Sequence, residues 1–199
     1  YPVSVYNVRE DYVNFDDSKV YGFEFDLQTN FSYLPAPLNG VVLSFNATRL
    51  WSETYLPLYF KVTKWDPAKR RNVVDFEKSY WEYLKTSLPD QVKWISNVSL
   101  GYDYKGFSSR ISMAYQARYL RDLSSAGEGE NVKFENQYVN NFLRFDASLS
   151  QKIGKHFMLM ANLANFTGES ERQYQYLPKY PRSENRYGTT IDLGIQYKF

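Results

Sequence analysis

Residues 19–33 alternate between mostly apolar and mostly polar side chains. The odd positions include Tyr21, Phe23 and Phe25, and the even positions between them include Glu24 and Asp26. Successive side chains of a β-strand point to opposite faces, so the pattern predicts a strand with one aromatic and one polar face. Prolines and an Asn-Gly pair in residues 34–40 predict a turn, after which the alternation resumes over residues 41–48.

The same alternation returns five more times along the chain. Short connections at Lys105-Gly106 and at residues 152–155 predict tight turns, whereas residues 51–90, 121–137 and 167–185 predict long loops. We therefore expect about seven antiparallel strands whose connections are short and long in turn. The five further predicted strands are residues 92–104, 107–119, 143–150, 157–163 and 187–199.

This alternation of short and long connections favours an up-and-down transmembrane β-barrel, which has short periplasmic turns and long extracellular loops. The longest predicted strands reach a dozen residues or more, enough for the about 9–11 residues with which a tilted strand crosses a bilayer. A soluble β-sandwich is the alternative, but its loops would not sort by length. Tyrosines and a tryptophan also recur near strand ends, where an interfacial girdle belongs: Tyr21, Tyr33, Trp51, Tyr104, Tyr119, Tyr187 and Tyr197.

The strand around Phe145 fixes which face meets lipid. A shift by one residue would turn Arg144 and Asp146 toward hydrocarbon, and an arginine near the bilayer midplane costs about 2–4 kcal/mol. The face that carries Leu143, Phe145 and Leu149 is therefore expected to be the lipid face.

Composition is compatible with this fold and excludes several functions. The 199 residues include 37 aromatic side chains (19 Tyr, 14 Phe and 4 Trp), and the net charge is only +2, which argues against binding nucleic acid. The absence of cysteine excludes a disulfide scaffold and a thiolate metal site. No run approaches the about 20 apolar residues of a transmembrane helix.

The predicted strands are too few to close by themselves. Bacterial single-chain barrels have an even number of strands and no free edge, so about seven strands predict the C-terminal part of a larger barrel, over residues 19–199. Residues 1–18 are then expected to be an extracellular loop segment. An eighth strand over Val3 to Tyr12, closing a small barrel, is the alternative, although its alternation is poor.

Few residues suggest chemistry. His156 is the only histidine and has no carboxylate cluster near it in the sequence, so we expect neither an enzyme nor a bound cofactor or metal. Glu24 and Asp26 lie on the predicted polar face, where carboxylates are expected in a water-filled barrel lumen, so they do not indicate a catalytic pair. Four Asn-x-Ser/Thr triplets fall in or at the end of predicted strands, where a polar lumen face explains them better than glycosylation: Asn30, Asn46, Asn97 and Asn165.

The loop predicted over residues 51–90 is the main candidate for binding. Asp75 is predicted to cap a short helix with Phe76, Tyr80 and Leu84 along one stripe. The loop could clamp a ligand, contact a lipoprotein or lipopolysaccharide, or pack on itself as a lid. The candidate residues, with two from the loop over residues 167–185, are Trp51, Tyr55, Tyr59, Trp65, Arg70, Arg71, Trp81, Tyr176 and Arg182.

Taken together, these segments make the chain resemble the C-terminal barrel segment of TonB-dependent outer-membrane receptors, of the type common in Bacteroidetes. The resemblance rests on the order and spacing of residues 19–24 (KVYGFE), 33–40 (YLPAPLNG), 101–107 (GYDYKGF) and 162–167 (NLANFT). It implies a barrel of about 22 strands, plugged in its lumen, to which this chain gives about the last seven. A terminal assembly signal is also implied, formed by Ile191, Leu193, Ile195, Tyr197 and Phe199.

The resemblance implies import of a scarce or bulky ligand, such as a siderophore, cobalamin or a glycan, across the outer membrane of a Gram-negative bacterium. The implied partners are outer-membrane lipid and lipopolysaccharide, the rest of the barrel with its plug, TonB through the missing N-terminal part, the barrel-assembly machinery and a surface lipoprotein. The alternatives are a structural or interaction subunit of a surface or secretion complex, and a small closed barrel.

Overall fold

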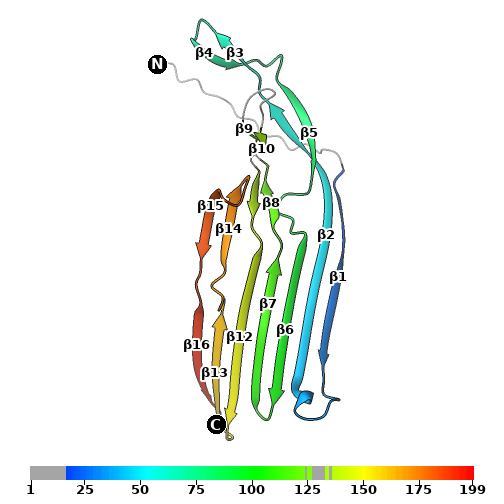
Figure 1. Cartoon of the computed structure of the whole chain (residues 1–199), viewed down its shortest axis with the longest axis vertical. Helices are drawn as coiled ribbons and strands as arrows, with labels where there is room; N and C mark the ends of the chain where they lie inside the picture. The colour runs from blue at the N-terminus through cyan, green and yellow to red at the C-terminus, as the bar shows by residue number, and fades with distance from the viewer. Residues whose placement is uncertain (1–16, 124, 127–132, 135) are drawn as a thin grey trace.

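The computed structural model describes residues 17–123, 125–126, 133–134 and 136–199. This part of the chain is all-β, with one short 3-10 turn, η1 (Leu38–Gly40), and no α-helix. Seven long strands lie side by side in one antiparallel sheet in the order β1-β2-β6-β7-β12-β13-β16, and an eighth, over residues 80–86, pairs with β2 outside this order (Figure 1). Their bounds are β1 (Lys19–Asn30), β2 (Val41–Phe60), β6 (Trp94–Tyr104), β7 (Phe107–Gln116), β12 (Phe142–Ile153), β13 (Phe157–Ala164) and β16 (Thr190–Tyr197).

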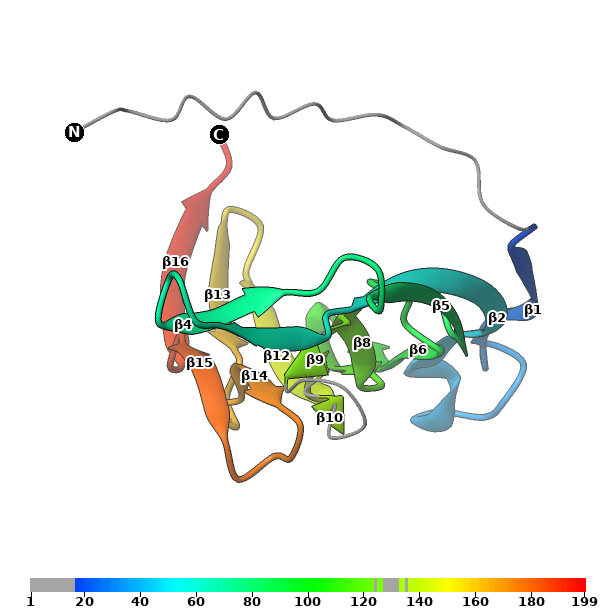
Figure 2. The ribbon, with the colours of Figure 1, turned by 90° about the horizontal axis from the view of Figure 1, so that it is seen from above.

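Each of these strands overlaps one that the alternation predicts, although β2 continues past the predicted end at residue 48 to Phe60. Consecutive long strands are neighbours in the sheet. The short connections are turns, as predicted: both Lys105 and Gly106 have positive φ angles, of 46° and 83°. Glycine adopts such an angle without a steric penalty, which suits this two-residue hairpin. The sheet curls into an open trough with β1 and β16 at its two rims (Figure 2).

The three long connections are not irregular loops, so that part of the prediction is wrong. Strand β2 continues to Phe60 and pairs there with β5, and residues 170–186 form a hairpin that joins β8 and β11 in a separate four-stranded sheet. These elements extend beyond one end of the seven strands (Figure 1). Their bounds are β3 (Thr63–Asp66), β4 (Arg71–Val74), β5 (Tyr80–Thr86), β8 (Tyr119–Asp122), β9 (Ser125–Ala126), β10 (Lys133–Phe134), β11 (Gln137–Val139), β14 (Ser170–Gln175) and β15 (Pro181–Arg186).

The helix predicted after Asp75 is also absent, because residues 80–86 form β5 instead. Two aromatic pairs across the hairpin favour the strand: Tyr59 packs against Trp81 with ring centroids 5.0 Å apart, and Phe60 stacks on Tyr80 at 5.2 Å. Asp75 closes a turn, since its carbonyl oxygen accepts a 2.9 Å hydrogen bond from the Ser79 amide. The strand considered over residues 3–12 lies outside the described residues.

Candidate functional site

The seven-stranded sheet has one apolar and one polar face that are continuous across all its strands. The register places Leu27, Phe45, Val98, Met113 and Phe145 in one cross-strand row. The adjacent row, one residue along each strand, points to the other face and consists of Gln28, Ser44, Ser99, Ser112 and Asp146. A shift of the register by one residue between any two strands would place apolar residues beside polar ones on the same face. No such shift occurs in these rows, so the register agrees with the predicted alternation.

The apolar face is exposed. Ile191, Leu193 and Ile195 of β16 are 63%, 80% and 74% exposed, and Phe199 beyond them is fully exposed. The residues of the predicted assembly signal therefore lie on or beside this face. Among the described residues only four hydrophobic side chains are buried: Ala47, Phe60, Leu120 and Tyr174. An extended, mostly apolar surface of this kind indicates contact with lipid or protein rather than with water.

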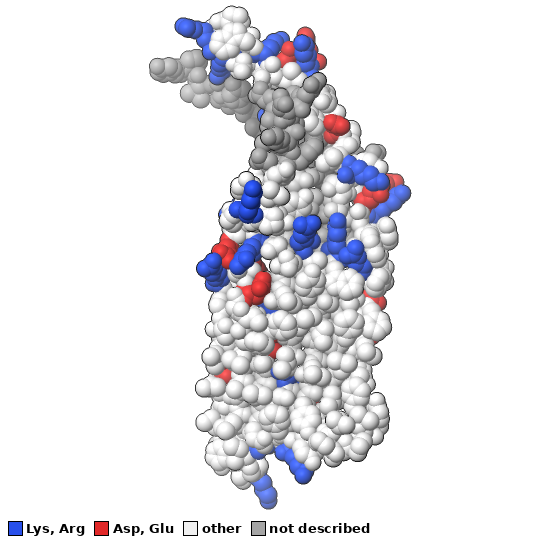
Figure 3. Space-filling view, viewed as in Figure 1, with Lys and Arg blue, Asp and Glu red and all other residues white. Residues whose placement is uncertain are grey.

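The charged side chains on this side of the sheet lie mainly at the ends of the long strands. Figure 3 shows the convex face, whose broad body over the long strands carries almost no Lys, Arg, Asp or Glu. Charged residues gather in a band above this body and, as a few basic groups, at its lower end. The apolar belt thus has charged borders at both ends of the strands.

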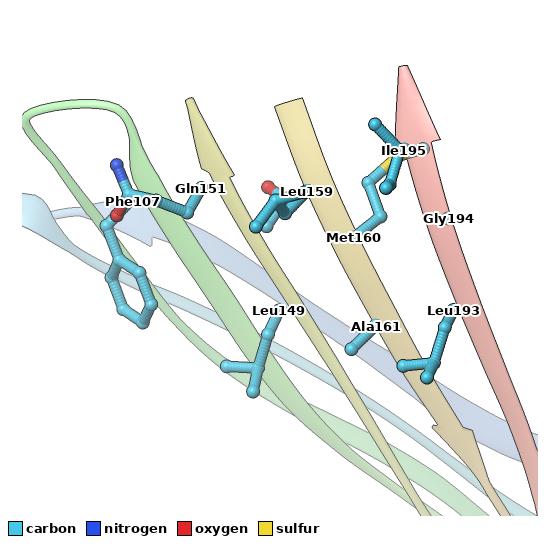
Figure 4. Close-up of a pocket in the computed structure, with 10 residues that line it drawn as sticks. Phe107, Leu149, Gln151, Leu159, Met160, Ala161, Leu193, Gly194 and Ile195 are labelled. Atoms are coloured by element: carbon cyan, nitrogen blue, oxygen red, sulfur yellow. The ribbon is translucent and has the colours of Figure 1, made fainter. Parts of the chain in front are cut away.

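A shallow apolar depression of about 480 Å³ lies on this face between β7, β12, β13 and β16 (Figure 4). It forms because Ala161, paired with Leu149 on one side and Leu193 on the other, carries only a methyl group. Its floor offers packing surface and no charged group.

Among the described residues, two ion pairs lie on the polar face of the long strands. Arg110 Nη1 donates to Asp103 Oδ1 at 2.9 Å, and the hydroxyl of Ser108 donates to the same oxygen at 2.6 Å. Arg144 Nε donates to Asp146 Oδ1, also at 2.9 Å. All four charged side chains keep between about a third and half of their surface exposed, so they can also bind polar groups from solvent.

Between these ion pairs lies a polar cavity of about 280 Å³. Its wall includes Arg110, Arg144, Asp146, Ser148 and Asn162. The hydroxyl, amide, carboxylate and guanidinium groups of this wall can exchange hydrogen bonds with polar molecules from solvent.

The candidate binding residues are spread over the extensions rather than gathered in one cleft. Trp51 stacks on Tyr21 at 5.7 Å, at the upper end of the apolar face. Tyr55, Tyr59 and Trp81 lie on the β2–β5 hairpin. The others occupy two hairpins: Trp65, Arg70 and Arg71 in β3–β4, and Tyr176 and Arg182 in β14–β15.

The β2–β5 and β3–β4 hairpins are rich in exposed rings and cations. Trp65 and Trp81 are 60% and 62% exposed, and Phe76 is 77% exposed. Of these three rings, Trp81 packs against Tyr59, with the two ring centroids 5.0 Å apart. This extension is therefore available for binding outside the sheet.

No protein-family model matches this chain, and no curated protein or solved structure is significantly similar to it. The part of the chain that the structure describes contains no helix with the length and hydropathy to span a bilayer. Its histidine and carboxylates form no cluster of three or more that could hold a metal ion. His156 Nδ1 lies 2.9 Å from the carbonyl oxygen of Lys198, which ties the ring to the backbone.

Two features of the site do not follow from the strand pattern alone. Asn165, considered above as a lumen residue, is buried in the turn after β13 and forms hydrogen bonds with Asp146, Glu169, Gly188 and Thr189. The second feature is Arg49, a charged residue that lies on the apolar face because it pairs with Phe23 and Trp94. Its odd position, directly after Phe45 and Ala47 in the alternation, is the signal that could have found it.

Proposed function

We propose that this chain forms part of the wall of a transmembrane β-barrel in a Gram-negative outer membrane, and that the barrel is a TonB-dependent transporter importing a scarce or bulky polar ligand. The single observation that carries the membrane part is the exposed apolar face, continuous over seven strands. In water this face would associate nonspecifically, whereas in a bilayer it meets hydrocarbon.

Strand length supports the same proposal. Strand β6 has 11 residues and β7 has 10, which matches the about 9–11 residues of a tilted transmembrane strand. Aromatic side chains lie at both ends of the belt: Tyr21 and Trp51 at one end, and Tyr197 and Phe199 at the other. Such rings are favoured at the two membrane–water interfaces.

The open rims support a larger barrel. Among the described residues, β1 pairs only with β2, and β16 pairs only with β13. Each rim presents a row of unpaired backbone groups, which hydrocarbon does not tolerate. Further strands, from elsewhere in a longer chain or from another chain, would satisfy both rims.

The transport part of the proposal rests on the polar face and on the resemblance described above. Ion-paired arginines and serines line the inner side of the trough, where a passing ligand would meet them. The resemblance supplies the coupling to TonB and the ligand classes: a siderophore, cobalamin or a glycan.

Uptake measurements test this proposal. Cells that produce the whole barrel protein should accumulate at least one labelled ligand among a ferric siderophore, cobalamin and an oligosaccharide, and a protonophore should abolish this uptake. Deleting the gene should abolish uptake, and reintroducing the gene should restore uptake. Equal uptake of all three with and without the gene would contradict transport.

A second candidate function is a structural or interaction subunit of a surface complex. The exposed tryptophans of the β2–β5 and β3–β4 hairpins favour it, because such rings commonly anchor protein interfaces. A lipoprotein that co-purifies in equal amount, without energy-dependent uptake, would support this function instead.

A further inference from the structure

Arg49 is an exception on the apolar face. It pairs with Phe23 on β1 and with Trp94 on β6, so the three side chains share the face of the exposed hydrophobic rows. Its guanidinium lies 5.0 Å from the ring centroid of Trp51, which holds it against the aromatic border of the belt. A charge at this place marks the level at which hydrocarbon gives way to polar surroundings.

A cavity of about 420 Å³ opens at this level. Three cations line it, Arg49, Lys93 and Arg118, together with the hydroxyl-bearing Thr86 and Ser87. No aspartate or glutamate belongs to the described lining. The cavity therefore concentrates positive charge within a volume typical of ligand sites, about 300–1,000 Å³.

The neighbouring acids do not neutralise these cations. Asp90 lies 3.6 Å from Arg121, and Glu53 lies 2.8 Å from Lys85. Within the described residues Arg49, Lys93 and Arg118 form no ion pair, and Lys93 and Arg118 are exposed. Arg49 also donates a 3.4 Å hydrogen bond to the carbonyl oxygen of Lys93. An anion entering the cavity would thus meet three positive charges that no described carboxylate neutralises.

The chemistry of the cations points to phosphate. Arginine presents a planar fork of donors that matches phosphate oxygens, and lysine adds a mobile point charge. A lipid with a phosphorylated headgroup fits better than a free anion, because the exposed apolar rows begin directly beside the cavity and would cover its acyl chains.

We propose that Arg49, Lys93 and Arg118 bind the phosphorylated headgroup of an anionic lipid at the loop-side border of the apolar belt. This inference rests on the proposed membrane location. The bound headgroup would hold one end of the apolar belt at the membrane surface and so fix the depth of the sheet in the bilayer.

Lipid retention on the whole barrel protein tests the site. The protein is reconstituted in nanodiscs of phosphatidylcholine with a minor fraction of phosphatidylglycerol, released into detergent, and the lipids that remain bound are counted by native mass spectrometry. We expect the double variant Lys93→Gln/Arg118→Gln to retain phosphatidylglycerol about tenfold less than the unchanged protein. Arg49 is kept, because it also packs on Trp51.

The matched control is Lys61→Gln/Lys78→Gln, which removes the same charge from exposed positions outside the cavity lining. It should retain phosphatidylglycerol like the unchanged protein. Lys93→Gln alone serves if the double variant does not fold, and an intermediate loss is then expected. Unchanged retention in the cavity variants, or an equal loss in the control, would overturn the proposal.

Two further arms separate the sources of binding. Inorganic phosphate at millimolar concentration should not displace the lipid, and full displacement would mean a site for a free anion. Phosphatidylcholine should be retained less than phosphatidylglycerol, and equal retention would mean apolar contact alone. Insertion is measured first by protection from protease, so a protein that never enters the nanodisc refutes the membrane location as well as the lipid site.

Discussion

At the scale of single residues, position along the alternation decides the surroundings of a side chain. Ile111, in the middle of β7, is 55% exposed although it lies between Leu100 and Ala147 in one row. Ser112, the next residue, lies on the polar face, and its hydroxyl is 3.3 Å from that of Ser99. Two neighbouring positions thus allow the two faces to be compared directly.

We expect Ile111→Arg to lower the free energy of unfolding of the barrel in lipid vesicles by about 2–4 kcal/mol, because the arginine would lie in hydrocarbon. Ser112→Arg is the matched control on the polar face and should change this free energy by about 0.5 kcal/mol or less. Chemical denaturation followed by tryptophan fluorescence measures both. A similar small effect for both variants would mean that both faces meet water.

Glu184, outside the long strands, shows how charge organises the extensions. Its carboxylate accepts hydrogen bonds from Arg186 at 2.7 Å, Ser170 at 2.9 Å and Arg172 at 2.8 Å. These bonds, that from Arg186 foremost, lower the pKa of Glu184 from 4.5 to about 2. The carboxylate therefore stabilises the β14–β15 hairpin fully above pH 4.5, and this contribution is lost as the pH falls through about 2.

An NMR titration of the Glu184 carboxyl carbon should accordingly show a midpoint near pH 2. In the variant Arg186→Gln the midpoint should rise toward 4.5, since the largest cause of the shift is removed. The variant Lys179→Gln, which changes a cation beside Tyr180 in the turn of the same hairpin, is the control and should leave the midpoint in place. A midpoint near 4.5 in the unchanged protein would contradict the three-donor arrangement.

At the scale of elements, the sequence predicts the long strands well and their extensions poorly. The seven strands follow from a period of two, because along most of each strand every second side chain is apolar, with Arg49 as an exception in β2. Residues 51–60 and 80–86 carry aromatic residues on both faces of a ribbon, for example Tyr59 and Phe60, so no single parity marks them. The register of the β2–β5 hairpin depends on cross-strand pairs that no local pattern reveals.

Asn165 illustrates the same limit in a turn. Its φ angle of 51° belongs to the left-handed region, and its side-chain amide donates to the carbonyl oxygens of Glu169 and Gly188, both at 2.9 Å. The partners are up to 23 residues away in sequence, so an Asn-x-Thr triplet cannot disclose them. These bonds connect the end of β13 with the starts of β14 and β16.

We expect Asn165→Ala to destabilise this turn by about 1–3 kcal/mol, because buried backbone groups lose their partners. Asn165→Gly is the comparison: it keeps the φ angle but loses the same side-chain bonds, so it should be less harmful than alanine. Hydrogen exchange of the amides of residues 165–170 measures both. If alanine and glycine both match the unchanged protein, the turn does not depend on Asn165.

The β2–β5 hairpin can be shortened without disturbing its paired part. Phe60 and Tyr80 are partners in the register, so a two-residue Asn-Gly turn can replace residues 61–79. Membrane assembly should then be unchanged, while binding of the ligand or protein partner should fall at least tenfold, since Trp65, Arg70 and Arg71 are removed. If the variant without residues 61–79 still binds, the interaction lies outside the β3–β4 hairpin. The equivalent shortening of the β14–β15 hairpin, at residues 176–180, serves as the comparison.

At the scale of the whole molecule, the arrangement of the connections implies a sidedness. The β3–β4 hairpin and the β14–β15 hairpin extend from one end of the sheet, whereas the turns at residues 105–106 and 154–156 lie at the other (Figure 1). Outer-membrane barrels place long connections outside the cell and short turns in the periplasm. The two ends of this sheet should therefore differ in access from outside.

Because the chain has no cysteine, single introduced thiols can report that access without background. Lys69→Cys in the β3–β4 hairpin should react with a membrane-impermeant maleimide in intact cells, whereas Lys155→Cys in the turn before β13 should react only after the outer membrane is permeabilised. Both side chains are exposed, so burial does not explain a difference. Equal labelling in intact cells would exclude a membrane between the two ends. The reverse order would keep the membrane but invert the barrel, and would place the lipid site of Arg49, Lys93 and Arg118 at the inner rather than the outer leaflet.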